Sequence, residues 1–259
     1  MILDTIAASS RRRAEAMKQD GRVERIRKAA EGFHTDGGKR FRERLAAPGL
    51  SFLCELKRAS PSKGVIAEEF PYMDIARTYE EAGAAAVSCL TEPDHFLGSM
   101  DYLRQTAAAL AIPVLRKDFI TDVCQIEEAA LAGASAVLLI AAMLTDEELQ
   151  RFLHRMEALG MAALTEVHDG EELRRALAAG ADIIGINHRN LKDFSMDLTL
   201  TERLRPGVLC VAESGLTDRA AVRRMKEAGA DAVLIGEMLM RAQDRGTLLR
   251  QMIQENQDR

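Results

Sequence analysis

The chain has 259 residues, of which 47% are apolar, and its formal net charge is −5. This length fits one large domain or two small ones, and the apolar content is ample for a buried core. The negative charge argues against a general nucleic-acid or membrane binder, and the longest run of apolar and small residues, 134–144, is too short to span a membrane.

The first predicted element is a helical extension over residues 1–45, in which Ile2, Ile6 and Ala7 share one stripe and Arg11–Arg13 follow. Residues 1–50 hold 12 Lys/Arg and 7 Asp/Glu, a local excess of 12 − 7 = +5. The extension is either a solvated cap or a basic cover over an anionic site, and the sequence leaves both readings open. Asp4 lies near the start of this segment and the basic residues follow its apolar part, which reverses the order of a secretion signal. We therefore expect a cytoplasmic protein.

Four segments then repeat the tripeptide Ala-Gly-Ala between a helical stretch and a short β-rich run. Their glycines are Gly83, Gly133, Gly180 and Gly229, which are 50, 47 and 49 residues apart. Glycine after a helix tolerates the left-handed conformation of a helix C-terminus. Four further strands are expected within residues 51–60, 112–120, 160–167 and 207–215, so strands and helices alternate as in a parallel sheet.

Eight such units, spaced by roughly 24 residues, predict an α/β fold that closes as a single (β/α)8 TIM barrel. We expect one domain over 1–259, with the N-terminal helical extension over 1–45 and the barrel over 50–245. A doubly wound open sheet is the structural alternative. It would normally carry a glycine-rich nucleotide turn after the first strand, and the sequence contains no GxGxxG.

Barrel interiors are filled mainly by aliphatic side chains, yet five predicted strands end in polar groups on the inward-facing phase. These groups are Glu55 with Lys57, Lys117, Glu166, Asn187 with Arg189, and Glu213. Buried ion pairs that only hold the barrel together are the alternative reading. Because desolvation makes buried charges costly, five such strand ends are a poor device for stability. Their position at the C-terminal ends of the strands favours a catalytic site.

A phosphate site is predicted where Ser214-Gly215 ends the seventh strand and Gly236 ends the eighth, just before a short helical segment. Backbone N–H groups after these two strands commonly bind phosphate in barrels. The five histidines show no spacing typical of metal ligands, so we expect no metal and no organic cofactor. The four cysteines contain no C-x-x-C pair and are expected to be buried, reduced thiols.

Nearly the whole chain, up to about Arg241, resembles the indole-3-glycerol phosphate synthase family of tryptophan biosynthesis. The most specific match is ELKRASPSKG over residues 55–64. It is joined by Leu90-Thr-Glu with Phe96-x-Gly-Ser99, Lys117-Asp-Phe119, Thr165-Glu166-Val, Gly185-Ile-Asn187-x-Arg189-Asn-Leu191, Ala212-Glu213-Ser214-Gly215 and Ile235-Gly236-Glu237. The resemblance implies a carboxy-lyase that closes, decarboxylates and dehydrates 1-(2-carboxyphenylamino)-1-deoxyribulose 5-phosphate without a metal.

The resemblance also implies a role for each matching residue. Lys117 is similar to the general acid that protonates the ketone, and Glu166 to the acid/base partner of the dehydration. Lys57 matches a lysine that holds the substrate and can protonate the departing hydroxyl; which lysine serves which step stays open. The residues that position these lysines and the sugar are Glu55, Asn187 and Glu213. The phosphate and polar-contact set is Ser60, Arg189, Ser214, Gly215, Gly236 and Glu237, the last through its backbone, and the wall of the aromatic ring is Leu90, Phe119 and Leu138.

Burial and the second lysine are expected to draw the pKa of Lys117 towards neutrality, while neighbouring glutamates keep it protonated. The sequence departs from the family pattern at His188, Cys124 and Met238, none of which replaces a proposed catalytic group. His188 is out of phase with Asn187 and is expected to face away from the barrel interior as a hydrogen-bonded histidine.

Two other functions remain possible at this stage. A Schiff-base aldolase is also a barrel with interior lysines, and its covalent imine would be trapped by borohydride. A catalytically inactive sugar-phosphate-binding barrel is the second, because fold alone does not establish activity. We expect a small phosphorylated substrate as the binding partner, no nucleic acid or membrane, and a monomer without an obligate protein partner.

Overall fold

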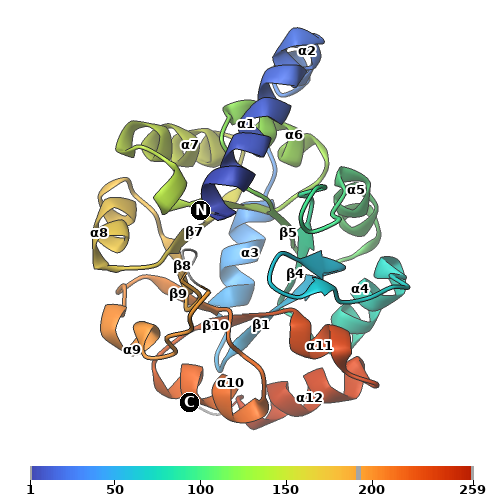
Figure 1. The fold of residues 1–259 in the computed structure, drawn as a ribbon, viewed down its shortest axis with the longest axis vertical. Helices are drawn as coiled ribbons and strands as arrows, with labels where there is room; N and C mark the ends of the chain where they lie inside the picture. The colour runs from blue at the N-terminus through green and yellow to red at the C-terminus, as the bar shows by residue number, and fades with distance from the viewer. Residues whose placement is uncertain (1, 191–193, 258–259) are drawn as a thin grey trace.

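The computed structural model describes residues 2–190 and 194–257, so Leu191 of the sequence motif lies outside the described residues. Its core is a closed barrel of eight parallel strands, in the order β1-β10-β9-β8-β7-β6-β5-β4 (Figure 1). The strands are β1 (Ser51–Leu56), β4 (Ala86–Leu90), β5 (Val114–Lys117), β6 (Ala136–Ile140), β7 (Ala162–Val167), β8 (Ile183–Asn187), β9 (Leu209–Glu213) and β10 (Ala232–Ile235). The predicted (β/α)8 barrel is therefore confirmed.

The strands are buried on both faces, which explains why they read as continuous apolar runs rather than as alternating ones. All five residues of β6 are buried, and so are all six of β1 and of β7. Each strand pairs in register with the next, for example Leu138 with Leu164 and Gly185 with Val211. This parallel register brings the C-terminal ends of all strands to one rim of the barrel.

Helices surround the barrel and begin and end at recognisable signals (Figure 1). Asp122 and Thr145 form capping boxes that satisfy backbone N–H groups at the starts of the helices over Val123–Leu131 and Asp146–Ala158. The four repeated glycines, each of which follows a helix, all have positive φ, between 88° and 98°, as predicted for left-handed helix ends. The outer helices are α4 (Tyr72–Glu81), α5 (Met100–Ala109), α6 (Val123–Leu131), α7 (Asp146–Ala158), α8 (Gly170–Ala178), α9 (Leu200–Leu204), α10 (Arg219–Glu227), α11 (Glu237–Arg241) and α12 (Arg245–Glu255), with a 3-10 turn η1 (Ala141–Met143).

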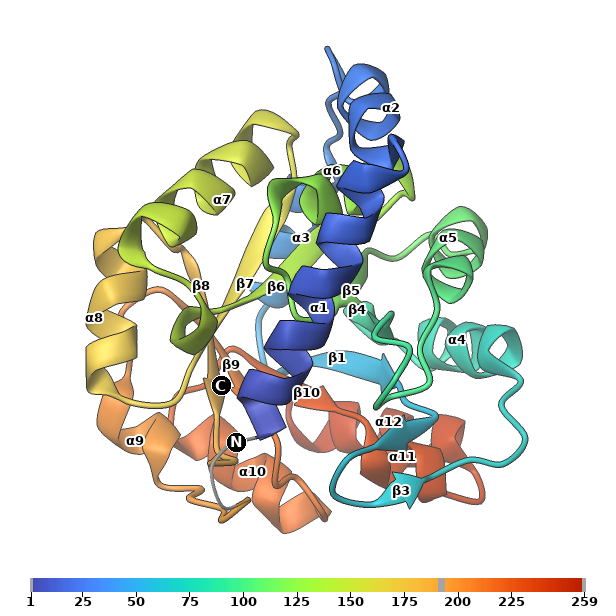
Figure 2. The ribbon, with the colours of Figure 1, turned by 45° about the horizontal axis from the view of Figure 1, so that its top comes forward.

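Three helices precede the barrel: α1 (Ile2–Gln19), α2 (Arg22–Ala29) and α3 (Gly37–Leu45). Helix α3 packs under the barrel, where the N–H of Gly38 donates to the carbonyl of Gly160 and Phe41 is fully buried. Helix α1 crosses the opposite rim, in front of the strands in Figures 1 and 2, and α2 projects beyond the ring of helices. The extension therefore closes both ends of the barrel.

The segment after β1 differs from the sequence prediction. The expected strand over residues 51–60 ends at Leu56, and a small antiparallel hairpin of β2 (Ala59–Ser60) and β3 (Gly64–Val65) follows it. Lys57 thus lies just beyond the strand rather than within it. Within the described residues, no helix is long and apolar enough to cross a membrane.

Candidate active site

A cavity of about 600 Å³ opens at the C-terminal rim of the barrel and collects the predicted site residues. Its walls come from all eight strands or the loops that follow them, and from α1. All fifteen residues singled out from the sequence line it: Glu55, Lys57, Ser60, Leu90, Lys117, Phe119, Leu138, Glu166, Asn187, Arg189, Glu213, Ser214, Gly215, Gly236 and Glu237. Their individual roles remain predictions.

The charged residues form one network at the floor of this cavity. The ammonium of Lys117 donates to Oε2 of Glu213 at 2.9 Å and lies 3.7 Å from Oε2 of Glu166. Asn187 Nδ2 donates to Oε1 of Glu166 at 3.0 Å. Beside them, Lys57 pairs with Glu55, whose side chain is fully buried. Four different strands thus aim charged groups at one point, as the inward phase predicted.

The expected depression of the Lys117 pKa is wrong. Burial lowers the pKa of this ammonium, but the carboxylates of Glu213, Glu166 and Glu55 outweigh burial and raise its pKa above the ordinary value. The second lysine does not counter them, because Lys57 is paired with Glu55. Lys117 is therefore fully protonated at neutral pH and can donate both a proton and a hydrogen bond.

The two carboxyl groups beside Lys117 have opposite shifts. Burial raises the pKa of Glu213 to about 7, with support from Glu166 and Glu55 and against the influence of Lys117. Burial acts in the same direction on Glu166, but hydrogen bonding by His168 and the charge of Lys117 outweigh it and lower the pKa to about 2. Two neighbouring carboxyls whose environments separate their pKa values are typical of acid/base sites.

Close packing explains two glycines of this network. A methyl group at Gly236 would overlap the carboxylate of Glu55, and one at Gly185 would overlap that of Glu213. The glutamates therefore lie directly against the backbone of the neighbouring strands, where an added methyl group would displace their carboxylates. This contact fixes the height of each carboxylate in the barrel.

The predicted phosphate side of the cavity is built from left-handed and glycine-rich backbone. Ser214 and Gly215 have φ values of 67° and 74°. Gly236 precedes α11, whose first residue Glu237 turns its carboxylate away to Arg241, at 2.9 Å. This ion pair engages the Glu237 carboxylate, so the predicted phosphate contact of Glu237 would have to use its backbone N–H.

Apolar side chains form the rest of the wall. Leu90, Phe119 and Leu138 lie around the cavity with Phe96, whose ring centroid is 5.9 Å from that of Phe119. Helix α1 adds Leu3 and Ile6. Such a mixture of apolar walls and a few convergent polar groups is typical of small-molecule sites.

The structure answers the question that the basic extension left open. Helix α1 covers the cavity, but with apolar residues, because its arginines are engaged elsewhere. Arg13 pairs with Glu92 at 3.1 Å and with Asp94 at 2.9 Å, and lies 3.6 Å from Asp118. The helix is therefore a cover fastened by ion pairs at the ends of β4 and β5, and these arginines do not line the cavity.

Sequence reasoning did not single out His168 and considered the histidines only as possible metal ligands. His168 lies two residues after Glu166, just beyond the end of β7 at Val167, and its Nε2 atom is 3.2 Å from Oε1 of Glu166. Extending the alternation by one step would have found it.

His188 behaves as expected: it is buried and contacts the Ser214 carbonyl at 3.1 Å and the Thr201 hydroxyl at 2.7 Å, on the side of α9.

Other expectations can be compared with the described residues. The four cysteines are free and buried, as predicted. Across residues 2–190 and 194–257, no three His, Cys, Asp or Glu side chains gather as metal ligands would.

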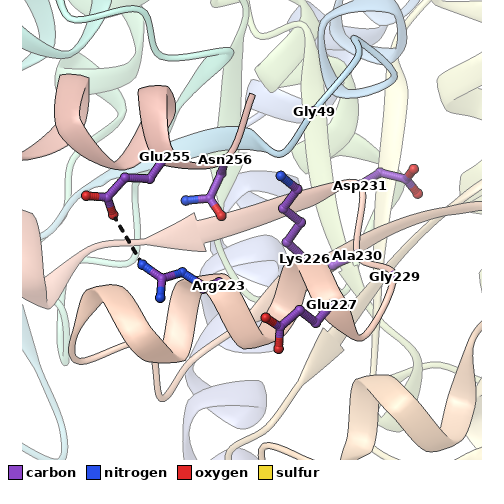
Figure 3. A pocket seen from close by; sticks show the side chains of 9 residues that line it. All are labelled: Gly49, Arg223, Lys226, Glu227, Gly229, Ala230, Asp231, Glu255 and Asn256. Atoms are coloured by element: carbon purple, nitrogen blue, oxygen red, sulfur yellow. Dashed lines mark ion pairs between the residues drawn. The ribbon is translucent and has the colours of Figure 1, made fainter. Parts of the chain in front are cut away.

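A second cavity, of about 540 Å³, lies at the opposite ends of β1 and β10, and Arg223 and Glu255 face each other there at 3.9 Å (Figure 3). None of the fifteen site residues lines it.

Comparison with known proteins agrees with this geometry. Residues 3–252 match the family model of indole-3-glycerol phosphate synthase. The chain is 45% identical to the indole-3-glycerol phosphate synthase of Ruminiclostridium cellulolyticum, over 96% of this chain and 97% of that protein. It is 46% identical to that of Lactiplantibacillus plantarum, over 97% and 98%. Among solved structures, thiamine phosphate pyrophosphorylase from Pyrococcus furiosus shares the fold alone, with a TM-score of 0.59 and 19% identity over 83% of this chain and 98% of that chain.

Proposed function

The chain belongs to the indole-3-glycerol phosphate synthase family, and on this premise we propose how its residues carry out the reaction. The protein is a carboxy-lyase of tryptophan biosynthesis. Its substrate is 1-(2-carboxyphenylamino)-1-deoxyribulose 5-phosphate, and its products are indole-3-glycerol phosphate, CO2 and water. The ring carbon that bears the carboxylate attacks the C2′ ketone, CO2 leaves, and the C2′ hydroxyl then departs as water.

Lys117 protonates the ketone oxygen during ring closure. As the aromatic carbon bonds to C2′, negative charge develops on this oxygen, and a fixed ammonium stabilises it in a site from which water is largely excluded. Glu213 holds the ammonium at 2.9 Å. Loss of CO2 then returns the bonding electrons to the ring and restores aromaticity. This step needs no metal, because rearomatisation drives it.

Glu166 serves the dehydration. Removal of water from C2′ and of a proton from C1′ creates the double bond of the indole, and an ionised carboxylate is the base for that proton. The low pKa of Glu166 keeps it ionised across the neutral range. Lys57, which is paired with Glu55, holds the substrate and protonates the departing hydroxyl.

Binding is divided between the two sides of the cavity. The phosphate is bound by backbone N–H groups near Gly215 and Gly236, with Ser60, Ser214 and Arg189 as polar contacts. The anthranilate ring packs against Leu90, Phe119 and Leu138. We further propose that residues 1–259 form one domain, that the protein acts as a cytoplasmic monomer, and that it uses no metal or organic cofactor.

The observation that supports this proposal most strongly is the contact of Lys117 with Glu213 and Glu166 at the floor of a cavity with apolar walls. The test is purified protein with the carboxyphenylamino substrate, followed for release of CO2 and appearance of the indole product in equal amounts. Borohydride added during turnover is expected to leave activity unchanged. Covalent trapping at a lysine, or binding without CO2 release, would refute the proposal.

A further inference from the structure

A half-buried histidine that does not line the cavity contacts Glu166. His168 Nε2 is 3.2 Å from Oε1 of Glu166, and its Nδ1 is 3.0 Å from Oε2 of Glu172. The imidazole is 14% exposed and does not line the cavity, so it has no direct route to a substrate. Any influence that it has on the reaction must pass through Glu166.

Glu172 holds this imidazole in place. It lies in the first turn of α8, and its Oε2 also accepts the backbone N–H of His168 at 2.8 Å. The backbone N–H of Glu172 in turn donates to Asp169, the residue that caps the helix. The ring is therefore fixed from both ends, by β7 on one side and by the start of α8 on the other.

The contacts of the ring determine its charge. Nδ1 makes a hydrogen bond with Glu172, whereas Nε2 lies beside Oε1 of Glu166 as an ion pair without hydrogen-bond alignment. Neutral imidazole carries one N–H and would direct a lone pair at one of these carboxylates, whereas the imidazolium is attracted to both. Burial lowers the pKa of His168, but Glu166 and Glu172 outweigh burial and raise it to about 10. The charged groups that act on the ring are thus Glu166 from β7 and Glu172 from α8, and at neutral pH it is a cation.

The two oxygens of Glu166 have different surroundings. Oε1 contacts Asn187 at 3.0 Å and His168 at 3.2 Å, whereas Oε2 is 3.7 Å from Lys117, which lines the cavity. Oε1 is therefore held by Asn187 and His168, and Oε2 remains on the side of Lys117. A carboxylate held at one oxygen keeps both its orientation and its charge.

We propose that His168, fixed by Glu172, is the positioning residue of Glu166, which it orients through Oε1 and stabilises as the anion. This inference rests on the proposed function, in which Glu166 is the base of the dehydration. It assigns the His168–Glu172 pair a part in turnover but none in substrate binding. The effect must therefore appear in kcat and in its dependence on pH, and not in KM.

The test compares His168→Ala, His168→Gln and Glu172→Gln with wild type, after wild-type turnover has been established. His154→Ala is the matched control, because His154 is an exposed histidine on α7. For His168→Ala we expect kcat to fall roughly tenfold to a hundredfold, as for other residues that orient a functional group, with KM within about twofold of wild type. The control should match wild type in both constants.

The pH profile separates positioning from a structural role. The cation keeps the pKa of Glu166 low, so its loss raises that pKa and moves the acid limb of kcat to higher pH. His168→Gln retains a donor but no charge, and we expect it to recover part of kcat while its acid limb stays shifted. Glu172→Gln should shift the limb in the same direction by less, and it carries the test if the alanine variant does not fold.

An acid limb unchanged in every variant, or a rise in KM with unchanged kcat, would overturn the inference. A wild-type protein that forms no indole product would instead refute the proposed function. The two failures are therefore distinguishable.

Discussion

Replacing Lys117 with alanine tests the electrostatics of the site and the assignment of the general acid together. The ammonium contacts Glu213 at 2.9 Å and Glu166 at 3.7 Å, and no other cation is paired with Glu213 among the described residues. Removal of one preorganised donor to a developing oxyanion lowers kcat about 100- to 1000-fold, or roughly 3–4 kcal/mol at 1.36 kcal/mol per factor of ten. We expect at least this loss, with a smaller change in phosphate-dependent binding.

The same variant should lose stability in a manner that depends on pH. Glu213 has a folded pKa of about 7, above its ordinary value of 4.5. Its folded state therefore retains a proton that the unfolded chain loses between these values, and stability falls as pH rises through this window. Lys117 lowers the pKa of Glu213, so without it the buried carboxyl at about pH 8 must either take up a proton or stay an unpaired anion. Breaking such a pair costs about 3–5 kcal/mol. Near pH 5 the carboxyl is neutral, and we expect about 1–3 kcal/mol.

Two measurements check these values: steady-state turnover, and urea unfolding at both pH values. Lys39→Ala is the control, because the Lys39 side chain is 75% exposed and only faces Glu43 at 3.9 Å on the surface of α3. A Lys117→Ala protein that keeps most of its kcat would refute the assignment of the general acid. Equal loss of unfolding free energy at the two pH values would refute the assigned protonation of Glu213.

Three further predictions follow from the site. Glu166→Gln should lower kcat about a hundredfold or more, with a smaller effect on binding of a product analogue, because the base is lost but its shape is kept; a variant with normal kcat would contradict the role of Glu166. Gly236→Ala should lower kcat/KM about tenfold and cost about 1–3 kcal/mol of stability, because the added methyl group displaces Glu55. Gly170→Ala is the control: its methyl group has room, so neither kcat/KM nor stability should change. A chelator should leave turnover unchanged, and loss of activity that a divalent cation restores would exclude the metal-free reaction.

Much of the barrel could be predicted because its signals are local. The Ala-Gly-Ala repeats mark helix ends whose glycines have φ values near 90°, and these positions require the residue that tolerates this conformation. The inward phase of the strands brought together Glu55, Lys117, Glu166 and Glu213 from segments far apart in the chain. The alternation of inward and outward side chains along a strand can be read without tertiary information. Closure of the barrel then brings the inward side chains of different strands together.

The remaining features depend on contacts that alternation does not describe. The pKa of Lys117 was mispredicted because it depends on how many carboxylates lie near the ammonium, and the structure places three around it while Lys57 is occupied by Glu55. The position of α1 depends on ion pairs such as Arg13 with Glu92, between residues far apart in sequence. His168 lies beyond the end of β7, where the strand pattern was no longer followed.

The central claim is that this protein builds an indole, and the chain offers an unusually clear background for its test because it contains no tryptophan. Excitation selective for indole should leave the free enzyme nearly dark, since only Tyr72, Tyr79 and Tyr102 absorb nearby. On addition of the carboxyphenylamino substrate, a new indole emission should rise with turnover. While the product stays bound among Leu90, Phe119 and Leu138, it should emit at shorter wavelength than after release, and excess inorganic phosphate should weaken that shift. A mixture that stays dark while the substrate is demonstrably bound would contradict the account.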